Sequence, residues 1–213
     1  MSSIADLRKE YQLQSLSEKN VDTNPLHQFE KWWDEAILAK IEEANAMTLA
    51  TASSDGIPSA RIVLLKGFNE RGFIFFTNYN SYKAQQVTEN PRACLVFFWK
   101  ELERQIRITG LVEKISDTAN DEYFLGRPLA SRVGAWASPQ SQVIENREWL
   151  EANHHYFEQQ FEGKFVSRPQ HWGGYLVKPI NIEFWQGRPG RLHDRIQYVL
   201  EQDGSWQIER LAP

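Results

Sequence analysis

Apolar residues between positions 25 and 43 recur at three- and four-residue spacing, which is the pattern of an amphipathic helix. Pro25 suits the first helical turn, because proline has no backbone N–H to leave unpaired there. The pattern therefore predicts a helix from Pro25 to about Glu43. The apolar stripe that we expect in the core consists of Phe29, Trp32, Trp33, Ala36, Ile37 and Ile41.

From Ala46 onward the apolar positions alternate with polar ones, and this period of two predicts strands. Strands are predicted at 46–52, 57–66, 72–78, 92–99, 104–115, 173–186, 191–201 and 205–211. Glycine-containing turn signals separate several of them, at 53–56, 69–72 and 203–204. A succession of hairpins with many aromatic residues predicts a mainly β fold with flanking helices (α+β), built as an antiparallel barrel or sandwich.

Shorter helices are predicted at 81–90, 117–125 and 143–161. Ser81 is a suitable N-cap for the first of them, and an Asp/Thr pair is suitable for the second. Residues 126–142 read as irregular, and so long a stretch inside a compact domain is usually functional or disordered. Val133 and Trp136 argue against disorder, so we expect a functional loop.

The first 24 residues are polar, with loosely spaced apolar positions that predict a short helix at 5–11 and a linker after it. Taken alone, this segment reads as a frayed tail. The chain is therefore expected to consist of a flexible N-terminal segment at 1–24 and one domain at 25–213.

The composition is that of a soluble globular protein, with 41% hydrophobic residues among 213. A net charge of −4 argues against general nucleic-acid binding, and the absence of a long apolar run argues against a membrane span or signal peptide. We therefore expect a cytoplasmic protein. The single cysteine, Cys94, lies in an apolar strand and is expected to be buried and inert. His154 and His155 are adjacent on a helix and make a poor metal pair, so no metal site is predicted.

Residues 183–195 concentrate the candidate chemistry, with three arginines, a histidine and a tryptophan close together. Arg191, His193 and Arg195 have period-two spacing, so on a strand beginning at Arg191 they would share one face. Arginine binds anions through paired hydrogen bonds and also stacks on flat rings. The stretch therefore favours a site for a planar, anionic ligand over a solvated hairpin end.

Further cations occur at strand ends and in loops, namely Arg61, Lys66, Lys83 and Arg127. Arg61 and Lys66 flank four aliphatic residues, which predicts a buried strand with the two cations on opposite faces. Together with Ser131 and the residues of the 183–195 stretch, these cations suggest two bound anionic groups such as phosphates.

Seven motifs in order cover nearly the whole chain: RIVLLK at 61–66, FTN at 76–78, LERQ at 102–105, GAW at 134–136, FWQG at 184–187, RLHDR at 191–195 and RLAP at 210–213. In these motifs the chain resembles the pyridoxamine 5′-phosphate oxidase family, FMN enzymes that make pyridoxal 5′-phosphate. The resemblance implies a split β-barrel and a homodimer with two FMN molecules at the subunit interface.

The resemblance also implies which residues hold the ligands. Those for FMN are Arg61, Ile62, Val63, Leu64, Leu65, Lys66, Phe76, Thr77, Tyr82, Lys83, Gln105, Gln140, Ser141, Trp185 and Arg195. Those for the substrate are Arg8, Lys9, Glu10, Tyr11, Lys66, Tyr123, Arg127, Ser131, Arg191, Leu192 and His193. In this interpretation residues 8–11 cover the bound substrate, which replaces the frayed-tail reading of these four positions.

Two positions depart from the family pattern. Tyr82 stands where the family often has an arginine, so FMN phosphate binding would rest more on Arg61 and Lys83. Phe76 stands where a tyrosine also occurs, so its contact would lack a hydroxyl.

The implied reaction is oxidation of pyridoxamine or pyridoxine 5′-phosphate to pyridoxal 5′-phosphate, the last step of vitamin B6 cofactor synthesis and salvage. O₂ would accept the electrons and give H₂O₂, with NH₃ released from the amine. Arg191 and His193 would face the substrate, and Arg195 would stabilise the reduced flavin. Two alternatives remain open: another split-barrel flavin oxidoreductase, and a non-catalytic carrier of flavin or B6 phosphate.

Overall fold

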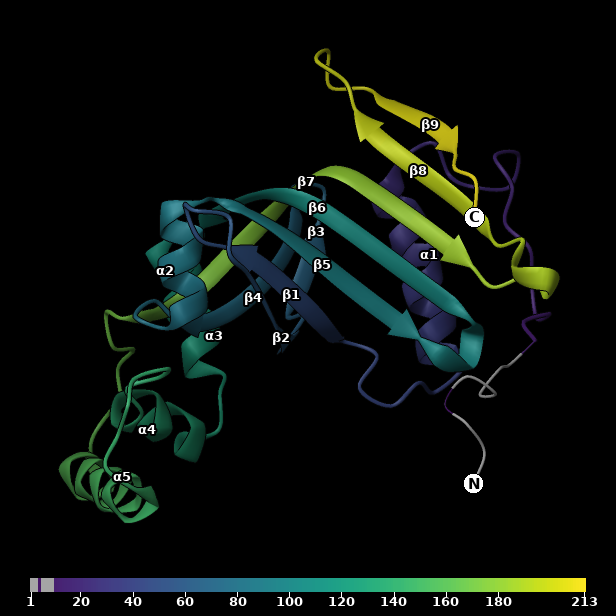
Figure 1. The fold of residues 1–213 in the computed structure, drawn as a ribbon. Helices are drawn as coiled ribbons and strands as arrows, with labels where there is room; N and C mark the ends of the chain where they lie inside the picture. The colour runs from purple at the N-terminus through teal and green to yellow at the C-terminus, as the bar shows by residue number, and fades with distance from the viewer. Residues whose placement is uncertain (1–3, 5–9) are drawn as a thin grey trace.

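The computed structural model describes residue 4 and residues 10–213, and its strands form one antiparallel sheet (Figure 1). In this described part nine strands follow the order β2-β1-β5-β6-β7-β4-β3, with β8 added to β7 and β9 to β8. The strands are β1 (Ala46–Ala52), β2 (Pro58–Leu64), β3 (Gly67–Asn69), β4 (Gly72–Asn78), β5 (Arg92–Trp99), β6 (Arg104–Lys114), β7 (Trp172–Gln186), β8 (Asp194–Leu200) and β9 (Trp206–Arg210). The helices are α1 (Pro25–Leu38), α2 (Tyr82–Glu89), α3 (Asp117–Leu125), α4 (Leu129–Ala137) and α5 (Arg147–Phe161).

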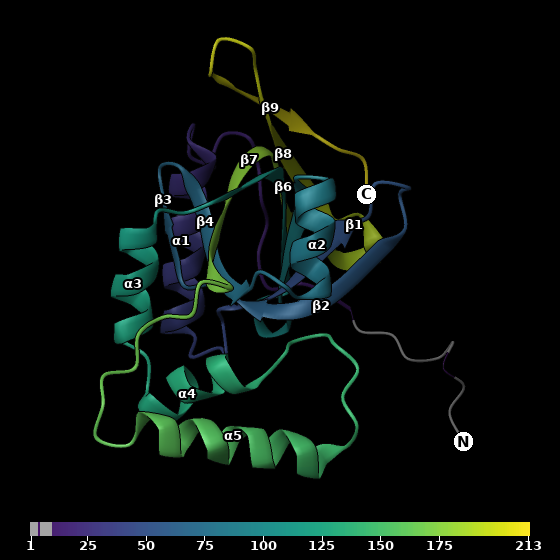
Figure 2. The same ribbon diagram turned by 90° about the vertical axis from the view of Figure 1, so that its left-hand side faces the viewer.

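The sheet curls because β7 belongs to two parts of it. The first half of β7 pairs with β4 and the second half with β8, while β6 runs along both halves. The register shifts between Thr109 and Gly110 of β6, where β7 has one extra residue, Ile180, and a bulge of this kind bends the strand that contains it. A Cβ at Gly110 would lie 2.2 Å from the Lys178 carbonyl oxygen, so glycine allows the two backbones to approach this closely. The bend produces the half-barrel seen in Figures 1 and 2 and confirms the mainly β fold.

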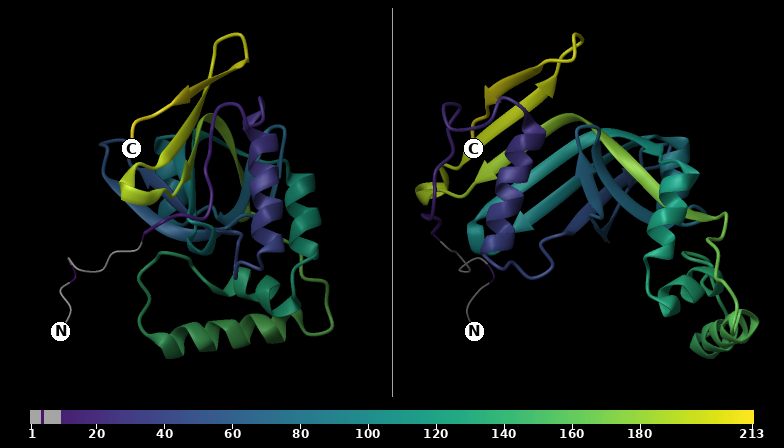
Figure 3. Two further views of the ribbon diagram at one scale, coloured as in Figure 1. Left: turned by 90° about the vertical axis from the view of Figure 1, so that its right-hand side faces the viewer. Right: turned by 180° about the vertical axis from the view of Figure 1, so that it is seen from behind.

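Helix α1 lies against one face of the curled sheet and brings an aromatic stripe into the core (Figure 3). Phe29 is fully buried, with its ring centroid 4.8 Å from that of Phe73 and 5.4 Å from that of Phe97. The Trp32 ring meets Phe184 of β7 edge-on at 5.2 Å. Edge-to-face pairs of this kind fix the helix on the sheet beyond the gain from burial alone.

The predicted extent of the first helix is wrong at its C-terminal end. Helix α1 ends at Leu38 and not at Glu43. Lys40 and Glu43 have φ values of 55° and 48°, and this left-handed conformation cannot continue a right-handed helix. Ile37, predicted to lie in the core stripe, is mostly exposed.

The irregular loop predicted at 126–142 contains a helix, α4, so that interpretation is wrong for its middle part. Local signals hide the helix, because Pro128, Gly134 and Ser138 all weaken helical propensity. The helix is stabilised by packing, because Val133 joins Phe124 in a second, smaller hydrophobic core. Figure 2 shows α4 and α5 together beyond one end of the sheet.

Other details of the elements also differ from the prediction. Helix α5 begins at Arg147 and not at 143, because Asn146 accepts a hydrogen bond from the Trp149 N–H (2.7 Å) as N-cap. A short strand, β3, precedes the turn predicted at 69–72. Ser81 lies at the N-cap of α2, but its hydroxyl makes no capping hydrogen bond. In the part of the chain that the structure describes, no helix is long and apolar enough to cross a bilayer.

Strand β2 lies at an edge of the sheet, so the predicted burial of the apolar run is wrong for a single chain. Ile62 is 64% exposed and Leu64 is 36% exposed. The strand ends at Leu64, so Lys66 is not constrained to the face opposite Arg61. On the neighbouring part of the sheet, Cys94 is half-buried and not fully buried.

Residues 10–24 lie against the rest of the chain. Leu16 is buried, and the Tyr198 hydroxyl donates to the Asp22 carbonyl oxygen (2.6 Å). Arg210 forms an ion pair with Glu18 (2.7 Å). The helix predicted at 5–11 falls almost wholly outside the described residues.

The cap of α3 is Ser116, one residue before the predicted Asp/Thr pair, and its hydroxyl accepts from the Ala119 N–H (3.2 Å). Replacement Ser116→Ala is expected to lower the free energy of unfolding by about 1 kcal/mol, the usual value of an N-cap. Urea unfolding at fixed protein concentration measures this loss. Thr118→Ala on the exposed face of the same helix is the control, and an equal loss in both variants would contradict the capping role.

Candidate active site

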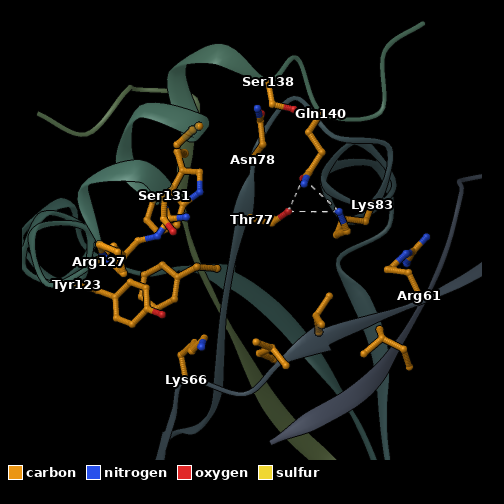
Figure 4. Close-up of a pocket in the computed structure, with 18 residues that line it drawn as sticks. Arg61, Lys66, Thr77, Asn78, Lys83, Tyr123, Arg127, Ser131, Ser138 and Gln140 are labelled. Atoms are coloured by element: carbon orange, nitrogen blue, oxygen red, sulfur yellow. Dashed lines mark hydrogen bonds between the residues drawn. The ribbon is translucent and has the colours of Figure 1, made fainter. Parts of the chain in front are cut away.

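A cavity of about 700 Å³ lies between the edge strand β2, strand β4 and helices α2, α3 and α4 (Figure 4). Among the residues that the structure describes, its lining includes four cationic side chains and no Asp or Glu. The lining residues are Arg61, Ile62, Val63, Leu64, Lys66, Phe76, Thr77, Asn78, Lys83, Tyr123, Arg127, Pro128, Ser131, Gly134, Ala135, Ser138, Gln140 and Trp172. A half-open space with this charge attracts anions.

Arg61 is held in place by a hydrogen-bond network beneath the cavity. Its Nη1 donates to the Leu49 carbonyl oxygen (3.1 Å) and to Thr51 Oγ1 (2.7 Å), and its Nη2 donates to Ser59 Oγ (2.5 Å). Both hydroxyls donate onward to Oε1 of the buried Gln86. The guanidinium is therefore oriented by residues of its own chain, and its Nε takes no part in these bonds.

Lys83 lies beside Arg61, in the first turn of α2. Its Nζ is 3.3 Å from both Thr77 Oγ1 and Gln140 Oε1, and 3.5 Å from Ser81 Oγ. Burial, and secondarily the charge of Arg61, lower the pKa of Lys83, and burial also lowers the pKa of Arg61. The charge of Arg61 disfavours the charged form of Lys83, so an anion between the two cations would be bound strongly.

The opposite side of the cavity carries a second cationic site. The Arg127 guanidinium lies 4.5 Å from the ring centroid of Trp172, and burial lowers its pKa. Its buried Nη1 has no hydrogen-bond partner among the described residues. Tyr123 stacks on Phe76 at 3.8 Å between ring centroids, which fixes the tyrosine ring at the cavity wall. Buried N–H groups without a partner are rare, and a ligand oxygen at this position would supply the missing acceptor.

Figure 4 shows how the two cationic sites are arranged. Arg127 and Lys66 lie on one side of the cavity and Lys83 and Arg61 on the other, with Thr77 between them. The cavity thus offers two separate places for anionic groups, as the scattered cations in the sequence suggested.

A second cluster forms at the far end of β7 and does not line the cavity. Trp185 contacts His193, with 4.7 Å between ring centroids, and the Tyr11 ring meets Trp185 edge-on at 5.7 Å. Gln105 and Arg195 flank Trp185 on the neighbouring strands. The residues predicted for one ligand site are therefore divided between two regions of the chain.

The predicted strand beginning at Arg191 is wrong, and so is the common face of the three basic residues. A short 3₁₀ turn occupies Pro189–Arg191, Arg191 has φ of 61°, and β8 starts only at Asp194. His193 precedes the strand, and its Nδ1 accepts a hydrogen bond from the Arg188 N–H (3.1 Å). In the neutral ring this bond leaves the proton on Nε2, which can donate to a ligand.

Arg195 is balanced by a carboxylate of its own chain. Its Nε and Nη2 bond both oxygens of the buried Glu183 (2.8 and 3.1 Å), and its Nη1 bonds the Ala212 carbonyl oxygen (2.8 Å). The paired hydrogen bonds raise the pKa of Arg195. Arg107 also contacts Glu183 at 3.1 Å, so this arginine pair surrounds one carboxylate.

Some predicted residues lie outside both groups. Leu65, the residue after β2, is buried, and Tyr82 is half-exposed. Ser141, with φ of 70°, is exposed beside Gln140. Arg8 and Lys9 lie outside the described residues.

Sequence reasoning missed the residues that support Arg61. Ser59 could have been identified from the sequence, because period-two spacing places it on the same strand face as Arg61. Nothing in the local pattern marked Thr51 or Gln86, which come from β1 and α2.

Comparisons with known proteins agree with this architecture. The family model described as pyridoxamine 5′-phosphate oxidase matches residues 33–161. The model described as the pyridoxine 5′-phosphate oxidase C-terminal dimerisation region matches residues 172–213, which supports a homodimer.

Individual relatives cover the whole chain. A pyridoxine/pyridoxamine 5′-phosphate oxidase of Trichormus variabilis is 57% identical over 99% of both chains. Another with this name, from Cupriavidus necator, is 56% identical over 100% of both chains. The solved structure of PhzG from Burkholderia lata, in complex with tetrahydrophenazine-1-carboxylic acid, superposes with a TM-score of 0.89 at 29% identity, covering 96% of this chain and 100% of that one. The fold, the two matched regions and the full-length identity place the chain in the pyridoxamine 5′-phosphate oxidase family, as an oxidoreductase of this type.

Proposed function

We propose that this protein uses FMN to oxidise pyridoxamine or pyridoxine 5′-phosphate to pyridoxal 5′-phosphate, with O₂ as the electron acceptor. The observation that carries the proposal is the cavity lined by four cations and no carboxylate, with its cations divided between two sides. Two phosphate-bearing ligands, a flavin nucleotide and a B6 phosphate, match this division. The names of the full-length relatives support the same assignment.

The Arg61 side of the cavity fits the FMN phosphate. Arg61 and Lys83 supply two cations, and Thr77 and Gln140 supply hydrogen-bonding groups next to them. A phosphate dianion would relieve the mutual repulsion of the two cations. When bound, FMN supplies the hydride acceptor and the route of the electrons to O₂, which yields H₂O₂.

The Arg127 side of the cavity fits the substrate phosphate. Arg127 and Lys66 would bind it with charge-assisted bonds, and Tyr123 and Ser131 would donate hydroxyls. The buried Arg127 Nη1 would gain the partner that it lacks among the described residues. Binding the phosphate here holds the reacting carbon of the substrate at a fixed position.

We propose that a second copy of the chain completes the site. Arg191 and His193 do not line the cavity of their own chain, while the β2 edge of that cavity exposes Ile62 and Leu64. In the homodimer the partner's basic turn would reach this edge, so that FMN lies at the interface. Arg191 would then lie against the substrate ring, and His193 Nε2 would donate to a ring substituent. Residues 1–24 would serve as a cover over the 25–213 domain.

One other reaction has a specific observation in its favour. PhzG, at 29% identity, was solved with a carboxylated tricyclic compound, and a cationic cavity also binds carboxylates. A flavin enzyme for such a ring system is therefore the second candidate. The pair Arg127–Lys66 favours a phosphate, because the two charges match its dianion.

Oxygen consumption by the purified yellow protein tests the proposal. With pyridoxamine 5′-phosphate we expect O₂ uptake together with equal amounts of pyridoxal 5′-phosphate and H₂O₂. Unphosphorylated pyridoxamine is the control, and it is expected to react poorly because it lacks the anchor for Arg127. Flavin binding without O₂ uptake would indicate a carrier, and a preference for a carboxylated ring would indicate the second candidate.

The lowered pKa of Lys83 predicts how FMN affinity depends on pH. Lys83 carries its charge below this pKa, which lies under the usual 10.5, and loses it as the pH rises through it. FMN affinity is therefore expected to fall about tenfold from about pH 7 to about pH 10, the contribution of one charge-assisted bond. Quenching of flavin fluorescence measures the affinity. Lys83→Arg keeps the charge and is expected to bind equally at both pH values; an unchanged affinity in the unsubstituted protein would contradict the role of Lys83.

A further inference from the structure

Residues 10–16 lie extended across the ends of β6, β7 and β8, and we call them the strap. Figure 3 shows the strap passing the turn that precedes β8 on its way to α1. The Gln12 and Leu13 N–H groups both donate to Glu103 Oε2, at 2.9 and 3.2 Å. The Leu16 N–H donates to Asp194 Oδ2 at 3.0 Å. Two carboxylates of the domain thus hold the backbone of the strap.

Glu103 ends the connection between β5 and β6, and its burial and backbone conformation are unusual for a glutamate in such a turn. It is 2% exposed, and its φ of 55° is left-handed, a conformation that costs free energy for any residue other than glycine. Its carbonyl oxygen also accepts from the Gly187 N–H (2.8 Å). The next residue, Arg104, bonds Gln14 Oε1 through Nη2 (2.8 Å). A strained, buried carboxylate that bonds two consecutive N–H groups of a distant segment indicates a specific anchor.

The anchor determines where Tyr11 lies. The Tyr11 ring meets Trp185 edge-on at 5.7 Å and lies 5.9 Å from the His193 ring. A Cβ added at Gly187 would lie 2.7 Å from Tyr11 Cγ, so the absence of a side chain at this position leaves room for the tyrosine. All of these contacts join the strap to residues of its own chain.

We propose that Glu103 is a positioning residue that acts through the strap: its carboxylate holds Tyr11 against Trp185 and His193 and so sets the position of this wall of the substrate site. The proposal rests on the proposed function, because it assigns His193 to the substrate. Contacts that favour this conformation of the strap increase substrate affinity, because they reduce the ordering that has to accompany binding. The turnover rate and FMN affinity do not depend on it, since Glu103 does not line the flavin cavity.

The test compares Glu103→Ala with Glu101→Ala in the full-length holoenzyme. Glu101 carries the same side chain in the same hairpin and is exposed. For Glu103→Ala we expect KM for pyridoxamine 5′-phosphate to rise about tenfold, the loss expected for a charge-assisted bond, with kcat and FMN affinity within about twofold. Glu103→Gln keeps an acceptor oxygen and is expected to restore part of the affinity. Hydrogen exchange of the amides at 12 and 13 is expected to accelerate in Glu103→Ala and not in Glu101→Ala.

Two further variants separate positioning from a general loss of structure. Tyr11→Ala combined with Glu103→Ala is expected to raise KM no further than Tyr11→Ala alone, because both act through one contact. Gly187 does not have a positive φ, so Gly187→Ala does not strain the backbone. Because the added Cβ would meet the Tyr11 side chain, the variant is expected to raise KM only while Tyr11 is present. Independent, multiplying effects on KM would overturn the proposal, as would an unchanged KM with unchanged exchange in Glu103→Ala.

Hydrogen exchange requires no turnover, so the two proposals fail separately. An unsubstituted protein without oxidase activity on B6 phosphates refutes the proposed function, whatever the exchange at 12 and 13. An active protein whose strap exchanges equally in Glu103→Ala refutes the positioning role alone.

Discussion

Mixed dimers of Arg127→Ala and Arg191→Ala subunits are expected to regain oxidase activity that neither variant has alone. Arg127 lines the cavity, whereas Arg191 lies in the turn before β8, outside the cavity of its own chain. If each site combines the cavity of one subunit with the basic turn of the other, a mixed dimer has one intact site and one doubly defective site. Random pairing should restore about a quarter of the wild-type activity, because about half of the dimers are mixed.

Each variant alone should lose about two orders of magnitude in kcat/KM, because each loses a charge-assisted contact to a bound group. Co-expression with two different affinity tags isolates the mixed dimers, whose activity should reach about half of the wild-type value with one of two sites intact. The control is a homodimer in which both subunits carry Arg127→Ala and Arg191→Ala together, and it should stay inactive. Purified mixed dimers as inactive as their parents would show that one chain supplies both arginines, and the two-subunit site would be wrong.

Arg61→Ala is expected to weaken FMN binding about a hundredfold, so that the purified protein is nearly colourless. The loss has two parts: one cation disappears, and Thr51 and Ser59 lose the group that they orient. Flavin content from the absorbance ratio, followed by titration with FMN, measures the change. Arg92→Ala, an exposed arginine on β5, is the control and should retain its flavin.

Arg61→Lys should not restore the affinity, although it restores the charge. A lysine ammonium cannot bond the Leu49 carbonyl oxygen, two hydroxyls and a phosphate in the geometry of a guanidinium. Full yellow colour in Arg61→Ala would contradict the role of this residue, and equal affinity in Arg61→Lys would contradict the role of its network.

The alternating pattern identified most of the sheet, because strands with one apolar face carry their own signal. β1, β4 and β5 begin and end at the predicted residues. Helix α4 was missed because its stability comes from the contact of Val133 with a distant core and not from its own residues. The start of β8 was misplaced because alternation in Arg191–Arg195 mimics a strand, whereas a Pro-Gly turn, with Gly190 at φ of 62°, sets the backbone.

The candidate site was predictable to the extent that motifs mark it. Arg61, Lys83 and Arg127 come from separate motifs and loops, and the fold brings them to one cavity. The separation of this cavity from Trp185 and His193 was not predictable from the pattern, because it depends on the path of β7. The role of Gln86 was not predictable either, because it depends on the position of this residue behind the hydroxyls of Thr51 and Ser59 in the folded chain.

The exposed edge strand β2 has a consequence for the newly made chain. Its outer backbone N–H and C=O groups and its apolar side chains Ile62 and Leu64 are uncovered in a single subunit. An edge of this kind is a template for adding a foreign strand. Within β2, Pro58 at the first position and Arg61 in the middle oppose such pairing, and the residues from Ile62 to Leu64 are all aliphatic. Strand addition at this edge, which leads to aggregation, therefore competes with dimer formation while few partner subunits are present. The yield of soluble protein should then depend on how quickly a subunit meets its partner after synthesis.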